Sequence, residues 1–126
     1  MPMWALRGAV QLDTDDKQHL LDRSQELFTI MLNSNAIGPQ DLVSVICTAT
    51  ADLRSAFPAA ALRTMGLEDV PLMCAQELDI EGALPRVVRI MAHVETAQAR
   101  PEVRHVYLGG AAALRRDLVS QSGESL

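Results

Sequence analysis

The sequence predicts a single α/β domain, of the kind also described as α+β, in which helices cover one face of a mixed β-sheet. Segments rich in β-branched residues and segments with helical periodicity follow each other in the order β-α-β-α-β-β-β. The 126 residues, 48% of them hydrophobic, suffice for one domain with its own core. Because two helices cannot cover both faces of such a sheet, we expect its other face to pack against a partner.

The first half of the chain is expected to form a strand, a helix and a second strand. The first strand spans residues 4–11, and Gly8 within it marks a bulge or a close backbone approach. The helix begins after a cap at Asp13 or Thr14, with acidic residues in its first turn, and ends near residues 33–35. Its buried stripe is formed by Leu20, Leu21, Leu27, Phe28, Met31 and Leu32. The second strand lies within residues 41–49.

The second half is expected to add a short helix and three strands. The helix opens at Phe57, is followed by a proline at an allowed early position, and stops at Gly66. The strands span residues 69–74, 86–94 and 103–108. Pro71 restricts the first of these strands to a sheet edge or a strand start. A pair of glycines then leads into one helical turn.

Composition narrows the class of protein. The net charge of -5 disfavours a nucleic-acid-binding protein, and no apolar run reaches membrane-spanning length. Arg7 comes too soon for a signal peptide, and Cys47 and Cys74 show no paired spacing, as is typical of reduced thiols in the cytosol. We therefore expect a cytoplasmic protein with no membrane contact, whose domain spans residues 1–118 and whose C-terminal tail, residues 119–126, is flexible.

Arg89 is the most informative residue. It lies in an apolar strand and shares a face with Val87 and Met91, because side chains alternate along a strand. A guanidinium among apolar neighbours is costly to desolvate unless an anion pairs with it. The anion is a carboxylate of the protein or of a ligand, and we favour the ligand.

Two guanidiniums, a phenol and a carboxylate could line one pocket for a small dianion: Arg7, Arg89, Tyr107 and Glu77. Cys74 stands on the predicted strand just before Glu77, and Arg63 ends the predicted short helix. No metal-ligand spacing links the three histidines, and there is no phosphate loop, nucleophile elbow or dinucleotide fingerprint.

Each candidate also has a purely structural interpretation. Arg7 is equally consistent with a simple salt bridge, and Cys74 with a small buried hydrophobe. Tyr107 fits a core residue with a satisfied hydroxyl, and Glu77 fits a solvated turn. From the residues alone, the ligand of the pocket stays open.

Several segments, taken in order, closely resemble the small monofunctional bacterial chorismate mutases of the trimeric α/β class. The resemblance runs from about Arg7 to Leu118, and the segments that carry it are residues 6–9, 49–53, 57–59, 70–79, 86–91, 104–108 and 114–118. The Cys-Ala-Gln-Glu run at 74–77 and the Arg-His-Val-Tyr-Leu run at 104–108 are specific in combination.

The resemblance implies a homotrimer whose sheets pack around the threefold axis, with active sites in clefts between subunits. The implied reaction converts chorismate to prephenate in the biosynthesis of phenylalanine and tyrosine, by an intramolecular [3,3] shift that needs no nucleophile, metal or cofactor. By the match, Arg89 bonds the ether oxygen and a carboxylate, which Arg7 and Tyr107 also hold. Glu77 accepts from the ring hydroxyl, with Cys74 beside it.

The resemblance also assigns the remaining contacts and shows two departures. The resemblance implies that the apolar walls of the site are formed by Phe57, Leu72 and Leu114. It places Arg63 near the mouth. Ala60 stands where the family has a lysine, which weakens capture of a dianion, and Met73 replaces a threonine among the substrate contacts. Two alternatives are a non-catalytic trimeric module that binds a small dicarboxylate and a trimeric imine/enamine deaminase. Glu77 together with Cys74 favours the mutase, since a plain anion sensor needs neither.

Overall fold

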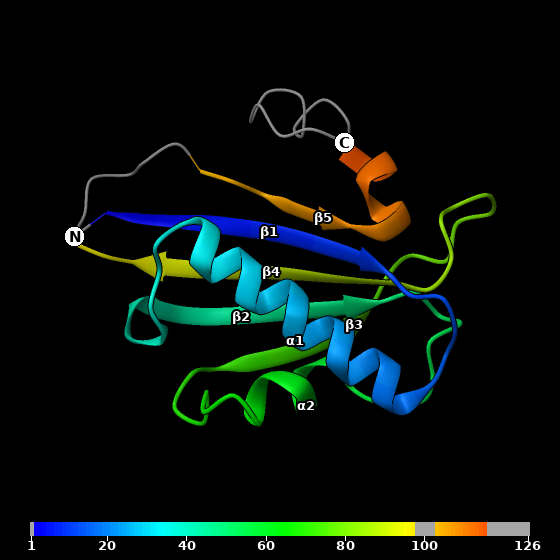
Figure 1. The fold of residues 1–126 in the computed structure, drawn as a ribbon, viewed down its shortest axis with the longest axis horizontal. Coiled ribbons are helices and arrows are strands. Elements are labelled where there is room, and N and C mark those ends of the chain that lie inside the picture. Colours follow the sequence, from blue (N-terminus) through cyan, green and yellow to red (C-terminus); the bar gives the residue numbers. More distant parts are fainter. Residues whose placement is uncertain (1, 98–102, 116–126) are drawn as a thin grey trace.

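The computed structural model describes residues 2–97 and 103–115, with side chains up to residue 112, and has the predicted order of elements (Figure 1). The elements are β1 (Met3–Gln11), α1 (Lys17–Ser34), the 3₁₀ turn η1 (Pro39–Asp41), β2 (Leu42–Ala49), α2 (Pro58–Arg63), β3 (Leu72–Gln76), β4 (Val87–Glu95), β5 (Val106–Leu108) and the 3₁₀ helix η2 (Gly109–Arg115). Within the described ranges, no helix is long and apolar enough to cross a membrane. The predicted tail lies outside these ranges.

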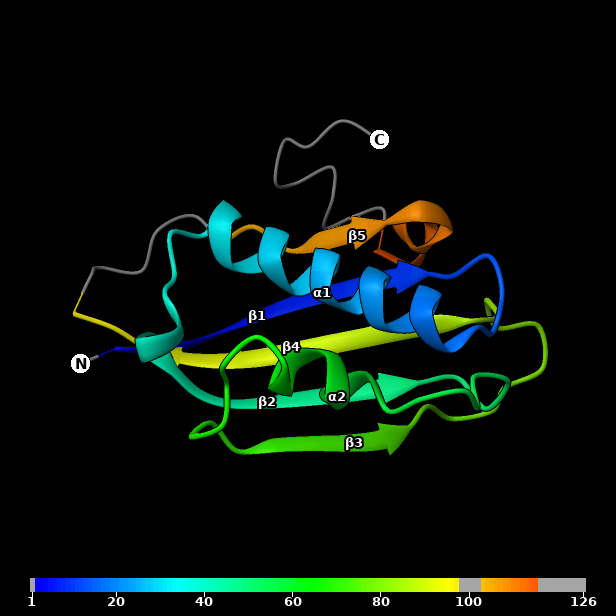
Figure 2. The same cartoon turned by 60° about the horizontal axis from the view of Figure 1, so that its bottom comes forward.

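The strands form one mixed sheet in the order β3-β2-β4-β1-β5. The inner pairs β2–β4 and β4–β1 are antiparallel, and the two edge strands, β3 and β5, pair in parallel with their neighbours. Helices α1 and α2 lie side by side on one face (Figures 1 and 2). The prediction of a mixed sheet with its two α-helices on one face is therefore confirmed; we call this the helix face and its opposite the open face.

The main core lies between the sheet and α1. The predicted stripe of α1 is buried, except that Leu21 is only partly covered. A Cβ atom on Gly8 would lie 2.5 Å from Met31 Sδ and 3.0 Å from Leu27 Cδ1. Gly8 therefore marks a close approach of β1 to α1, which is one of the two interpretations of this glycine.

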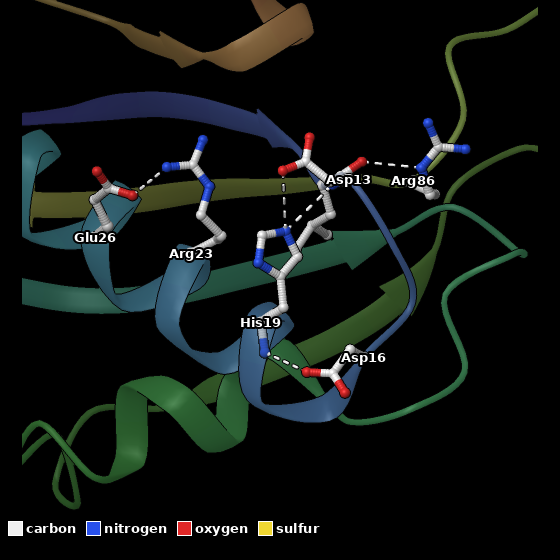
Figure 3. Close-up of polar contacts among 7 residues, drawn as sticks. Asp13, Asp16, His19, Arg23, Glu26 and Arg86 are labelled. Carbon is white, nitrogen blue, oxygen red and sulfur yellow. Dashed lines mark hydrogen bonds and ion pairs between the residues drawn. The ribbon is translucent and has the colours of Figure 1, made fainter.

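The start of α1 corrects the predicted cap. Asp16 is the N-cap, and its carboxylate accepts from the backbone N–H of His19 at 3.0 Å (Figure 3). The backbone N–H of Asp13 instead donates to His19 Nε2 at 3.2 Å. The first turn of this fully described helix holds no acidic residue. Several neighbouring acidic residues each fit the cap pattern. The cap is the one at which the extended backbone turns into the helix, and the sequence pattern does not show where this happens.

Strand β3 begins later than predicted and runs further. The Pro71 carbonyl accepts from the N–H of Val45 at 3.0 Å, so pairing with β2 begins here and continues to Gln76. Pro71 has no N–H of its own and stands just before the edge strand, in agreement with its predicted role.

Strand β5 is shorter than predicted because the residue that ends α1 forms hydrogen bonds with the backbone of the segment preceding β5. The side chain of Asn35, the C-cap of α1, donates to the Arg104 carbonyl and accepts from the Arg104 N–H, both at 2.8 Å. The backbone at this point therefore bonds to a side chain instead of to β1. Only Val106–Leu108 pair with β1.

The open face is covered only at one end. Ala9 and Val87 are buried there against Ala111 of η2, with Leu84 and Tyr107 packed around them. Met73 on the same face is 61% exposed. The last helical turn thus closes one end of the face and leaves the remainder uncovered.

Candidate active site

A row of four residues crosses the open face in register. Thr48 of β2 pairs with Arg89 of β4, Arg89 pairs with Ala9 of β1, and Ala9 pairs with Tyr107 of β5. Residues in register on neighbouring strands point to the same side of a sheet. The sheet therefore brings the predicted residues Arg89 and Tyr107 onto one face, although they belong to different strands.

A second row, two positions away, adds Arg7. Met91 pairs with Ile46 on one side and with Arg7 on the other. The two rows and Glu77 enclose a groove of about 280 Å³. We call it the sheet groove, and its lining is Arg7, Gly8, Ala9, Ile46, Thr48, Glu77, Arg89, Ile90, Met91 and Tyr107. The predicted residues Arg7, Glu77, Arg89 and Tyr107 thus share one groove.

Glu77 reaches this groove from the end of the edge strand. Its backbone N–H donates to the Ala49 carbonyl at 2.9 Å, which extends the β2–β3 ladder by one bond. Its carboxylate accepts from the Thr48 hydroxyl, and its side chain is only 26% exposed. The Thr48 hydroxyl therefore fixes the position of the Glu77 carboxylate, and Glu77 is not the solvated turn residue of the alternative interpretation.

Arg89 has a protein carboxylate beside it and an unused donor. Arg89 Nε lies 3.5 Å from Glu77 Oε1, which is an ion-pair distance, yet the buried Nε has no hydrogen-bond partner among the described residues. The side chain is 42% exposed, so it is less enclosed than its apolar neighbours in the sequence suggested. The protein supplies one anion through Glu77, and the rest of the guanidinium stays open to the groove.

Arg7 and Tyr107 complete the positive side of the groove. The backbone N–H of Arg7 donates to His105 Nδ1 at 3.1 Å, which ties β1 to the segment that leads into β5. Within the described residues, the Arg7 guanidinium makes no ion pair, so the simple salt bridge is not observed there. Both side chains are half-buried. Two guanidiniums, a phenol and a carboxylate therefore line one side of the sheet.

A second hollow, of about 580 Å³, lies on the helix side. It runs from the start of α1, along the loop between β2 and α2, to the edge strand β3. We call it the helix-side cleft, and its lining includes Lys17, Arg54, Phe57, Ala60 and Cys74. Pro58 occupies the first turn of α2, and Phe57 just before it is 71% exposed. The cleft is thus mostly apolar with two cations at its border.

Cys74 belongs to this cleft and not to the groove. It pairs in register with Cys47, which pairs with Ile90, and Cys47 and Ile90 are buried under the helices. Burial and the neighbouring Cys74 raise the pKa of the Cys47 thiol to about 12. Within one chain, Arg7, Arg89 and Tyr107 therefore share the groove, whereas Cys74 lies on the opposite face of the sheet.

Arg63, Leu72 and Met73 line neither of these two hollows. Arg63 and Leu72 line a smaller hollow of about 250 Å³ beyond α2. Met73 pairs with Ile46 and so faces the open side, whereas the side chain of Leu114 lies outside the described set. No group of three or more histidine, cysteine or acidic side chains arranged to hold a metal ion occurs in the described part of the chain.

Thr48 lines the groove and Lys17 lines the cleft, although neither residue was predicted from the sequence. Thr48 lies near the end of the predicted strand at 41–49. Alternation from the buried Val45 would have placed it on the open face, two residues from Ile46. Lys17 carries no pattern of its own, and only the fold brings it beside Phe57.

Comparison with known proteins places this geometry in a family. Residues 3–118 match the chorismate mutase type I family. Chorismate mutase AroH of Thermus thermophilus is 43% identical over 116 residues, covering 91% of this chain and 95% of that protein. Chorismate mutase AroH of Bacillus subtilis (strain 168) is 35% identical over 119 residues, covering 94% of each.

The fold agrees with the sequence comparison. A solved chorismate mutase structure from Clostridium thermocellum has a TM-score of 0.84 with this chain at 38% identity, and the match covers 87% of this chain and 98% of that one. The family match spans both the sheet groove and the helix-side cleft. The chain therefore belongs to the chorismate mutase type I family.

Proposed function

We propose that this enzyme rearranges chorismate to prephenate at a site built from two chains, with the sheet groove of one chain facing the helix-side cleft of the next. One observation carries the proposal: the candidate residues divide between opposite faces of a single sheet. A substrate in the groove of one chain cannot touch Cys74 or Phe57 of that chain. A neighbouring chain supplies them. Family membership supports this activity over the dicarboxylate sensor and the deaminase.

The reaction calls for orientation and for charge in the right place. The substrate must fold so that its enolpyruvyl arm lies over the ring, and negative charge builds on the ether oxygen as its C–O bond breaks. Arg89 bonds this oxygen and an adjacent carboxylate through the part of its guanidinium that stays open to the groove. Glu77 lies against the same guanidinium and limits its rotation. The cation is thus in place before the charge develops.

The other groove residues hold the substrate. Arg7 and Tyr107 bind the carboxylate that Arg89 also contacts, and Glu77 accepts from the ring hydroxyl. Thr48 occupies Glu77 Oε2, which leaves Oε1 to share between Arg89 and the substrate hydroxyl. Arg7, Tyr107 and Glu77 therefore each have one assigned partner on the substrate, and Arg89 has two.

The neighbouring chain closes the site from the other side. Cys74 lies beside the ring hydroxyl, and Phe57, Leu72 and Leu114 form apolar walls that keep water out. Arg63 stands near the mouth and Met73 at the contact between chains. Ala60 provides no charge in the cleft, so the cations at its border are Lys17 and Arg54.

The assembly proposed is a cytoplasmic homotrimer with its open faces turned inward. The uncovered part of the open face, with Met73 61% exposed, supports burial against another chain. Free cysteines at positions 47 and 74 are typical of a reducing compartment. Sedimentation equilibrium at micromolar protein should give the mass of a trimer, and a monomer mass would contradict the shared site.

Complementation between two inactive variants tests the shared site directly. Arg89→Ala removes the cation of the groove, and Phe57→Asp places a carboxylate in the cleft, where a dianion must bind. In coexpressed mixed trimers, a groove from a Phe57→Asp chain can face a cleft from an Arg89→Ala chain, and such a site is intact. Random mixing of equal amounts gives about a quarter of the sites this composition, so we expect about a quarter of the parent activity.

The matched control pairs two groove variants, Arg89→Ala and Arg7→Ala. No arrangement of these chains produces an intact groove, so their mixed trimers should stay inactive. If the first mixture is also no more active than its parents while both variants remain trimeric, the site lies within one chain and the proposal is wrong.

A further inference from the structure

The two cysteines of the chain stand directly beside each other in the sheet. Cys47 of β2 and Cys74 of β3 are partners in the parallel register, and both are free thiols on the helix face. Neighbouring strands lie about 4.8 Å apart. This spacing falls within the roughly 4.4–6.8 Å that disulfide bonds require between Cα atoms. The neighbouring Cys74 thiol adds to the effect of burial in raising the pKa of Cys47.

The environments of the two thiols differ. Cys47 is fully buried, which shields it from oxidants in solution, and burial raises its pKa to about 12, so it is not the thiol that reacts first. Cys74 is half-buried and lines the helix-side cleft. A small oxidant entering the cleft therefore meets Cys74 first, with Cys47 immediately behind it.

We propose that Cys74 and Cys47 form an oxidation-sensitive pair in which a peroxide oxidises Cys74 and Cys47 closes a cross-strand disulfide. In the first step, the Cys74 sulfur takes one oxygen from the peroxide and becomes a sulfenic acid, and the peroxide is reduced to water or an alcohol. In the second step, the Cys47 sulfur displaces the hydroxyl from Cys74. The thiol proton leaves with that hydroxyl as water, and the S–S bond remains. A dithiol reductant returns both thiols.

The effect on turnover rests on the proposed function, whereas the disulfide itself does not. With its sulfur bonded to Cys47, Cys74 loses the thiol that would stand beside the substrate hydroxyl. Loss of one neutral hydrogen bond costs up to about tenfold in rate. Bound substrate fills the cleft, so it should also slow oxidation of Cys74.

Peptide mapping of the full chain after treatment with hydrogen peroxide tests the proposal. Remaining thiols are alkylated in denaturant before digestion with trypsin, which cuts the chain so that Cys47 lies in residues 24–54 and Cys74 in residues 64–86. We expect these two peptides to be joined in the treated protein and separate after reduction. We also expect kcat/KM to fall by up to about tenfold and to recover with a dithiol.

Cys47→Ala is the control variant, because Cys47 contacts no substrate in the proposed site. Its Cys74 should progress to sulfinic and sulfonic acids, and its loss of activity should resist reduction. Cys47→Val is a second variant with a side chain of similar bulk, should the alanine variant fold poorly. Mapping of the unsubstituted protein decides the question without either variant.

Two results would overturn the proposal. One is an oxygenated Cys74 with an alkylated Cys47 in the same treated chain, which means that the buried thiol does not react. The other is a link between the Cys74 peptides of two chains. A third result separates the two proposals. If the joined peptides form at the same rate with chorismate present, and the oxidised enzyme keeps its activity, the disulfide is confirmed but the cleft is not part of the active site.

Discussion

The two hollows of this molecule lie on opposite faces of one sheet and differ in chemistry. The sheet groove holds two guanidiniums, a phenol and a carboxylate, all on or next to strands of one sheet. The helix-side cleft is bordered by loops and by the start of α1, and its large exposed apolar side chain is Phe57. In the proposed site, the rigid sheet would carry the charges that the transition state requires, and the loops and helix ends would provide the walls.

The division has a physical basis. Groups that stabilise a developing charge must already be in position. Strand register fixes side chains more precisely than a loop can. Walls that exclude water tolerate more variation. Substitutions in the groove should therefore lower kcat, and substitutions in the cleft should have smaller effects.

The largest effect is expected at Arg89. Arg89→Ala should lower kcat more than it raises KM, because a cation at the breaking C–O bond acts mainly in the transition state. Loss of a preorganised donor costs roughly 10²- to 10³-fold, and loss of a full cation at least as much. Arg89→Lys should restore little, since one ammonium cannot span two acceptors. Steady-state kinetics with chorismate give both constants.

Replacement of Arg89 by citrulline separates its charge from its shape. Turnover of the citrulline variant at the parent rate would leave Arg89 as a positioning residue and remove the electrostatic basis of the comparison. Arg23→Ala is the matched control, because Arg23 pairs with Glu26 on α1, on the opposite side of the sheet from the groove (Figure 3). It should keep the parent kcat.

A smaller loss is expected at Thr48. Thr48→Val keeps the shape of the strand and removes the donor to Glu77. A hydrogen bond to a charged group contributes about 1.5–3 kcal/mol, so kcat/KM should fall roughly ten- to hundredfold. Thr48→Ser retains the hydroxyl and should keep most activity. Equal activity of the valine and serine variants would show that Thr48 does not position Glu77.

The cleft side should respond less. Cys74→Ser should keep most activity and Cys74→Ala should lose under about tenfold, because the reaction needs no thiolate and only one neutral hydrogen bond is at stake. Kinetics on trimers of verified mass measure the loss. A Cys74 variant that is trimeric yet inactive would require covalent chemistry at this thiol.

The smallest effect concerns the loop that borders the cleft. Asp15 accepts from the backbone N–H groups of Arg54 and Ser55 at 3.0 and 3.1 Å. The Ser55 side chain and then the Arg54 N–H lower the pKa of Asp15 below its ordinary 3.8. Since the folded pKa lies below the unfolded one, the stabilisation is present above pH 3.8 and is lost as the pH falls through the folded pKa.

Asp15→Asn should accordingly be less stable than the parent near neutral pH, and the difference should shrink on acidification. Urea midpoints of both proteins at pH 7 and near pH 3 measure it. A difference that is the same at both pH values would mean that the charge of Asp15 does not hold this loop.

Most of the fold could be predicted because its signals are local. The stripe from Leu20 to Leu32 and the break at Gly66 follow from periodicity and glycine alone. The cap of α1 was wrong because several neighbouring acidic residues fit one pattern. The start of β5 was wrong because a contact between Asn35 and Arg104, 69 positions apart, replaces the ladder. No local pattern contains such a contact.

The candidate site was predicted in part for a similar reason. Arg89 was identifiable because its apolar flanks belong to its own strand. Whether Cys74 shares its face depends on how β3, β2 and β4 align, and that register is fixed by pairing between distant segments. The residues were therefore found individually, and their division between two faces needed the structure.

The pairing of β5 with β1 also sets when the enzyme can first act. The hydrogen bond from Arg7 to His105 joins residues 98 positions apart. Such distant pairings form slowly, because the intervening chain must be ordered before the contact compensates for the lost entropy. On the ribosome, α1 and the first strand emerge well before Tyr107, which lies beyond His105 in the sequence. A nascent chain can already hold much of its core and still have an unfinished groove, so catalytic competence has to wait until β5 pairs with β1.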